Sequence, residues 1–171
     1  SQELKIMGEN VGDLTGTSIT ILRHSFPTRG SIDMFAIGEP GNDNGRGRVS
    51  FFSMYGYYQI LGSEGEEPLT ISEIDSITGD TQGEMFGHSV VSARNDSVCD
   101  WSQGTGYADI NTNFAVSSIG FDSYRGKVYL FKGVHDIHTT LTGSKQGEYF
   151  GTTIKFLTPD CVCIGSLNAE I

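Results

Sequence analysis

The chain has 171 residues, which is enough for one domain with a hydrophobic core, and its formal net charge is -10. This acidity argues against nucleic acid and anionic membranes as partners, because both need a basic surface, and no apolar run is long enough to insert into a bilayer. Charged residues reach only 19%, and 23 glycines stand against 4 prolines. This composition favours an all-β protein of short strands joined by glycine turns.

The first part of the chain alternates strand patterns with glycine-rich turns. A Gly-x-x-x-Gly-x-x-x-Gly motif at residues 8–16 leads into a run in which Ile19 and Ile21 share one face, as in a half-buried strand. Residues 41–47 read as a turn, since they are rich in residues that tolerate positive φ. The strands expected here lie at residues 4–7, 17–22, 32–37 and 48–55, with another near 58–61 or 69–71.

The glycine motif returns twice more in the same register, at residues 79–87 and 143–151. After the second copy the strand order repeats, and residues 126–131 match residues 47–52. After the third copy only two strands follow. The strands expected in these two parts lie at residues 88–93, 113–117, 126–131, 138–141, 152–157 and 161–164.

Four sequential antiparallel strands per repeat are the pattern of a β-propeller blade. We therefore expect one all-β repeat domain over residues 1–171, with repeat joints near 8–16, 79–87 and 143–151. It would hold about two full four-stranded blades with half-blades at its flanks. Such a set of blades is either an incomplete ring or part of a larger or oligomeric propeller.

Several stretches resemble the FG-GAP repeat of integrin α-subunit β-propellers. Residues 86–90 (Phe-Gly-His-Ser-Val) and 150–154 (Phe-Gly-Thr-Thr-Ile) are similar to the Phe-Gly half of that motif, and residues 37–40 stand where the family has Gly-Ala-Pro. Residues 117–119 depart from Gly-Ala-Pro in the second unit. The resemblance implies a non-catalytic adhesion or protein-recognition module outside the cell or at its surface.

The same family often carries a calcium loop between its first and second strands, in which alternating carboxylates converge on one cation. Residues 23–31 hold no carboxylate, and the later loop has aspartates whose spacing does not fit that motif. We therefore expect no cofactor and no resident metal. The weak calcium candidates are Asp96, Asp100 and Asp109.

The resemblance also implies which loops contact partners, because two sets of loops gather on one face of a propeller. Ordinary turn chemistry is the alternative interpretation of each residue in them. The ligand-binding candidates are Glu39, Asn42, Asp43, Arg46, Asp122, Tyr124 and Arg125.

No histidine lies beside a serine or cysteine in a recognisable nucleophile motif, so we expect no enzyme activity. Asn95 begins an Asn-x-Ser glycosylation sequon, which fits an extracellular or cell-surface location. Cys99 could pair with Cys161 or Cys163, and buried free thiols are the alternative. Expected partners are a protein, further copies of the chain or a glycan. Two other functions stay open: a structural subunit that assembles head to tail into a fibre or ring, and a carbohydrate-binding module.

Overall fold

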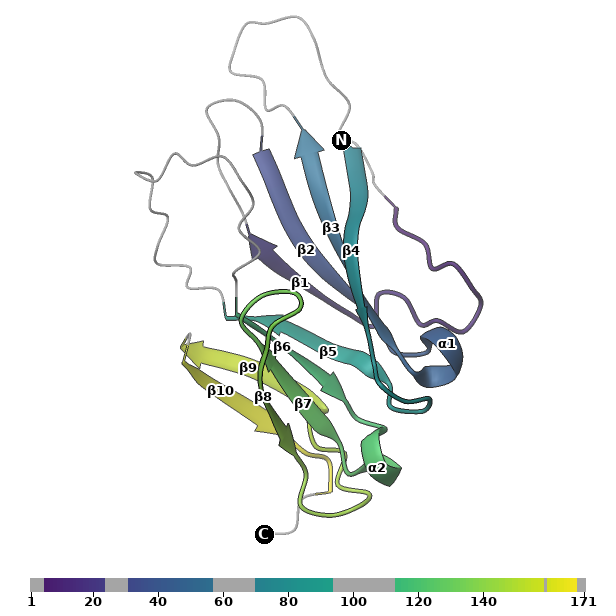
Figure 1. The fold of residues 1–171 in the computed structure, drawn as a ribbon, viewed down its shortest axis with the longest axis vertical. Helices are drawn as coiled ribbons and strands as arrows, with labels where there is room; N and C mark the ends of the chain where they lie inside the picture. Colours follow the sequence, from purple (N-terminus) through teal and green to yellow (C-terminus); the bar gives the residue numbers. More distant parts are fainter. Residues whose placement is uncertain (1–4, 24–30, 57–69, 94–112, 159, 169–171) are drawn as a thin grey trace, which may run out of the picture.

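The computed structural model describes residues 5–23, 31–56, 70–93, 113–158 and 160–168. These residues form short antiparallel strands and two helical turns of four residues each (Figure 1). The elements are β1 (Ser18–Arg23), β2 (Ser31–Glu39), α1 (Asn42–Gly45), β3 (Arg48–Gly56), β4 (Thr70–Thr78), β5 (Phe86–Ser92), β6 (Phe114–Ser118), α2 (Phe121–Tyr124), β7 (Lys127–Phe131), β8 (Ile137–Thr142), β9 (Thr153–Thr158) and β10 (Cys161–Gly165).

The strands form three sheets in which each strand pairs with its neighbour in the sequence. The first sheet has the order β1-β2-β3-β4, the second β5-β6-β7-β8, and the third contains only β9 and β10. Every pairing within these sheets is antiparallel, and the described strands close none of the sheets into a barrel. The prediction of an all-β fold with sequential four-stranded antiparallel sheets is confirmed.

The main core lies between the first and second sheets. Strand β5 packs against β1 and β2 on one side and against β9 on the other, so the second sheet lies between its neighbours (Figure 1). The rings of Phe51 and Phe114 meet edge to face across this core, with centroids 5.6 Å apart. Side chains alternate between the two faces of a strand, so the second sheet can pack one face on the first sheet and its other face on the third.

Two expected strands need correction. Residues 5–7 form no strand, which corrects the one expected at 4–7; residue 4 lies outside the described residues. The last strand of the first sheet runs over β4, well beyond the expected 69–71, while the alternative at 58–61 lies outside the described residues. Between the pairs Phe51–Asp75 and Phe52–Glu73, Ile74 is an extra residue in a bulge, which resets the alternation along β4 and hides its strand pattern.

The predicted turn at 41–47 is confirmed, and it occurs twice. Asp43, Asn44 and Gly45 have φ values of 48°, 55° and 78°. The equivalent residues of the second unit, Asp122, Ser123 and Tyr124, have φ values of 45°, 54° and 61°. Both turns are thus left-handed, a conformation that glycine, asparagine and aspartate adopt at the lowest cost and tyrosine seldom adopts.

Candidate functional site

Each glycine motif folds around one buried carboxylate, which directly follows the middle glycine. In the second motif Glu84 is 1% exposed, and its Oε2 accepts hydrogen bonds from the backbone N–H groups of Asp80 (3.0 Å) and Thr81 (3.1 Å). The hydroxyl of Tyr129, on β7, donates to the other oxygen of Glu84. The carboxylate therefore provides the hydrogen-bond acceptor for the backbone N–H groups of the turn, and its bond from Tyr129 links the turn to the second sheet.

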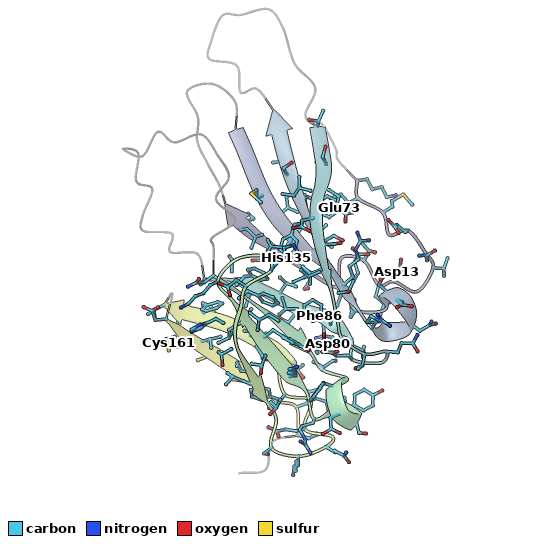
Figure 2. The ribbon with its side chains drawn as sticks, viewed as in Figure 1. Asp13, Glu73, Asp80, Phe86, His135 and Cys161 are labelled. Carbon is cyan, nitrogen blue, oxygen red and sulfur yellow. The ribbon has the colours of Figure 1, made fainter. Side chains whose placement is uncertain are left out.

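The other two copies repeat this arrangement with their own partners. Glu148 accepts from the backbone and hydroxyl of Ser144 and from the Oγ of Ser166 at 3.2 Å. Bonding from Ser144 holds the pKa of Glu148 below its usual range. Asp13 accepts from the backbone N–H of Asn10 at 2.9 Å (Figure 2). The sequence carried a signal for this role: an acid at one register position in all three motifs.

The glycine motifs also bind the left-handed turns of the preceding unit through the backbone. The N–H of Met85 donates to the carbonyl of Gly45 at 2.7 Å, and the N–H of Tyr149 donates to that of Tyr124 at 2.8 Å. In both places the carbonyl of the arginine that follows the turn accepts the N–H of the next phenylalanine: Phe86 donates to Arg46 at 3.1 Å, and Phe150 donates to Arg125 at 3.1 Å. One rigid joint is thus built twice.

We call the exposed side of α1, α2 and the adjoining glycine motifs the loop surface. Asp43, Asp122 and Tyr124 are exposed there, while Asn42 is partly buried. Glu39 lies apart from them: it is 4% exposed, and it accepts hydrogen bonds from Ser50 (2.6 Å) and Thr15 (3.3 Å). Its carboxylate therefore belongs to the frame, by which we mean the buried hydrogen-bonded residues beneath the loop surface.

The two turns carry the same ion pair at equivalent positions. Arg46 contacts Asp43 at 3.1 Å, and Arg125 contacts Asp122 at 3.1 Å, with all four side chains partly exposed. Beside α1 the surface sinks into a hollow of about 450 Å³, which is lined by residues 10–13, Gly41 and residues 43–45. Such exposed ion pairs contribute little to stability. Their arginine and aspartate side chains can therefore turn from each other to charged groups of a ligand.

An aromatic pair lies where α2 meets the third glycine motif. The rings of Tyr124 and Tyr149 stack with centroids 5.0 Å apart, and Tyr124 is 46% exposed. Gln146 of the same motif bonds to Asp122 at 3.3 Å. The resemblance to propeller loops implies that the loop that contains Gln146 lies on the same face as residues 121–125, but it does not single out Gln146, and it misses Tyr149 because the stack on Tyr124 becomes visible only when the two segments are placed in space.

A cleft of about 330 Å³ opens between β4 and the β7–β8 side of the second sheet. Tyr129 and Phe86 form part of its wall, and His135 contacts Asp75 at 2.8 Å at its rim (Figure 2). Burial, followed by the neighbouring Glu84 and Asp80, raises the pKa of Tyr129 well above its usual range. The hydroxyl therefore stays protonated and acts as a fixed hydrogen-bond donor to the glycine motif.

Several predicted residues lie outside the described part of the chain, namely Asn95, Asp96, Cys99, Asp100 and Asp109. Cys161 and Cys163 are free and exposed, so the prediction of buried thiols is wrong for these two. Within the described ranges, no group of three or more His, Cys, Asp or Glu side chains is placed to hold a metal ion. Across the same ranges, no helix has the length and apolarity needed to cross a membrane.

No protein-family model matches the chain, and no curated protein matches it either. The resemblance to FG-GAP repeats thus stays a prediction from the quoted residues. The paired turns and the tyrosine stack define a candidate surface, and the three buried carboxylates fix the glycine motifs beneath it.

Proposed function

We propose that this chain is a non-catalytic recognition module, built from FG-GAP-like blades of β-propeller type, that acts outside the cell or at its surface. It binds a protein partner through the loop surface. Three observations support the blade interpretation: the strand order within the sheets, the sequential packing of the sheets, and the joint that recurs between them. The Asn95 sequon supports the location.

The observation that carries the proposal is the tyrosine stack. Tyr124 occupies the position of Gly45, and it keeps a left-handed backbone that costs a bulky residue about 1–2 kcal/mol. A strained, exposed aromatic residue is more easily explained by contact with a ligand than by the needs of the fold. Tyrosine and arginine dominate the binding energy of protein interfaces, and Arg125 adjoins the stack.

Charge indicates the kind of partner. The chain has a net charge of -10, and the loop surface carries two aspartates, Asp43 and Asp122, beside its two arginines. Long-range attraction then favours a partner with a basic patch, while the arginines give local, geometrically specific contacts to its carboxylates. Buried acids such as Glu84 and Glu39 already bond to the frame, which supports recognition rather than catalysis.

A swap variant tests the proposal. Tyr124→Gly with Tyr149→Met places at the second joint the residues that the first joint has, Gly45 and Met85. We expect the native chain to bind members of an array of purified extracellular protein domains, and the swap variant to bind them at least about tenfold more weakly.

The control for this experiment is Ile137→Thr, which changes an exposed strand residue away from the loop surface and should leave binding unchanged. A glycan array is probed in parallel. Selective glycan binding would favour the carbohydrate-binding alternative. Protein binding that survives the swap would show that another surface is responsible.

A further inference from the structure

Over the part of the chain that the structure describes, two sheet faces carry exposed apolar side chains on their outward sides. The first outer face is the side of the first sheet that carries Ile19, Ile21, Phe35 and Phe52. Ile19 is 65% exposed and Ile21 is 50% exposed, whereas Phe35 is partly buried and Phe52 is 9% exposed, with their rings stacked at 5.4 Å, so the open part of this face lies along β1. None of these residues belongs to the core between the first and second sheets.

Inside the molecule, the equivalent face of the second sheet is covered. Val90, Phe114 and Phe131 stand at the positions of Ile19, Phe35 and Phe52, and they are 5%, 1% and 4% exposed. They are buried by the first sheet, which places Leu22, Met34 and Ala36 in the same core. The internal interface thus shows that a face like the first outer face is covered by a sheet that presents residues equivalent to Leu22, Met34 and Ala36.

The third sheet ends in the matching surface. Its outward side, the third outer face, carries Leu157, Cys161 and Cys163, which stand at the positions of Leu22, Met34 and Ala36. Leu157 is 61% exposed, whereas Leu22 is 5% exposed, and both cysteines are exposed (Figure 2). Thr153 also repeats Ser18, whose hydroxyl bonds to the carbonyl of Gly87 across the internal interface at 3.0 Å.

We propose that the third outer face of one copy of this chain docks on the first outer face of another. The contact repeats the internal packing of the first sheet against the second. That internal packing is made mainly by β1 and β2 against β5, so the two strands of the third sheet supply the corresponding part of the contact. Because the two faces differ, the contact is heterologous, and copies add in one direction, head to tail.

The internal interface also indicates which residues of two copies would touch. The hydroxyl of Thr20 lies 3.4 Å from that of Ser92 and accepts the N–H of Ser92 at 3.2 Å. The equivalent of Thr20 in the third sheet is Lys155, and the equivalent of Ser92 in the first sheet is Ile21. Lys155 of one copy should therefore lie against Ile21 of the next.

Two single-cysteine chains test this contact directly. Both carry Cys99→Ser, Cys161→Met and Cys163→Ala, of which the last two restore the residues found at Met34 and Ala36. One chain then receives Ile21→Cys and the other Lys155→Cys. On mild oxidation of the mixture we expect a heterodimer linked between positions 21 and 155, identified by peptide mass spectrometry. A third chain with Lys132→Cys, at an exposed position away from both faces, is the control partner and should not link.

Sedimentation velocity of the native chain gives the independent test. We expect its mean mass to rise with concentration, and Ile21→Lys to lower the association constant at least about tenfold, because a second ammonium group would be brought against Lys155 of the neighbouring copy. Ile137→Lys changes an equally exposed residue of β8 and should leave association unchanged. A chain that stays monomeric, association that Ile21→Lys does not weaken, or links between two copies of position 21 would each overturn the proposal.

Discussion

The two joints of this molecule share one backbone and differ in the side chains that they present. At the first joint Gly45 meets Met85, and at the second Tyr124 meets Tyr149, through N–H to carbonyl bonds of 2.7 and 2.8 Å. Met85 and Tyr149 even share a left-handed backbone, with φ values of 59° and 56°. The comparison separates two kinds of residue: glycines and buried acids that fix the joint, and exposed positions that are free to serve recognition.

The largest effect is expected from the glycine that follows each left-handed turn. A Cβ on Gly47 would lie 2.1 Å from the carbonyl oxygen of Phe86 and 2.3 Å from its nitrogen, and φ at this glycine is 84°. Gly47→Ala should therefore lower the free energy of unfolding by ~4 kcal/mol, as measured by urea denaturation, since a backbone clash adds to backbone strain.

Gly83→Ala is the matched control, because φ there is 78° and a Cβ would meet nothing within 4 Å. It should cost only about 1 kcal/mol, the price of the left-handed backbone alone. Gly126 repeats the clash at the second joint, with a carbonyl oxygen at 2.1 Å. Equal losses for Gly47→Ala and Gly83→Ala would contradict the close docking of the joint.

The next effect concerns the buried carboxylates. Glu84→Gln keeps the shape of the side chain and removes its charge, which several donors share, so unfolding free energy should fall by about 2 kcal/mol. Tyr129→Phe removes one donor to Glu84 and should cost about 1 kcal/mol.

Glu9→Gln serves as the control for both substitutions, because the Glu9 side chain is 71% exposed, and stability should change by less than about 0.5 kcal/mol. In the double variant the losses from Glu84→Gln and Tyr129→Phe should not add, since the two groups share a bond. Full additivity would argue that the hydroxyl and the carboxylate do not interact.

A smaller effect is expected at Glu148 of the second joint, where the free energy of unfolding should depend on pH in the acid range. The pKa of Glu148 is lowered by its bonds from Ser144, so the folded state takes up this proton less readily than the unfolded state does. The stabilisation is therefore present above the ordinary pKa of 4.5 and is lost as pH falls through the lower folded value. The stability advantage of the native chain over Glu148→Gln should narrow on acidification, and parallel stability curves would refute this.

The smallest effect is expected at His88. Burial lowers its pKa below the ordinary 6.5, so the unfolded chain binds the proton first, and stability falls as pH drops below that value. His88→Thr installs the residue that stands at this position in the other two motifs, as Thr17 and Thr152. The variant should show a flatter stability curve between about pH 7 and 5, and an unchanged slope would assign the dependence to other groups.

Much of the fold could be predicted from the sequence because it depends on local patterns. The glycine register located the joints, and the alternation around Ile19 and Ile21 located β1. The turn at 41–47 followed from residues that tolerate positive φ. The course of β4 could not be predicted, since the bulge at Ile74 breaks its alternation through contact with a neighbouring strand.

The candidate surface was only partly predictable for the same reason. The resemblance to propeller loops indicated Asp43, Arg46, Asp122, Tyr124 and Arg125, and the structure places these five residues in the two left-handed turns. That Glu39 turns inward depends on Ser50 and Thr15, which lie on other segments. The stack on Tyr149 likewise arises only where two units meet.

The unfolding free energy of the swap variant, Tyr124→Gly with Tyr149→Met, tests most directly whether the tyrosines serve recognition rather than the frame. The swap relieves strain at Tyr124 but loses a ring stack and adds a flexible glycine, and each of these effects is on the order of 1 kcal/mol. We predict a net change of less than about 1 kcal/mol. A loss of about 2 kcal/mol or more would show that the tyrosine pair holds the joint together, and it would contradict the account.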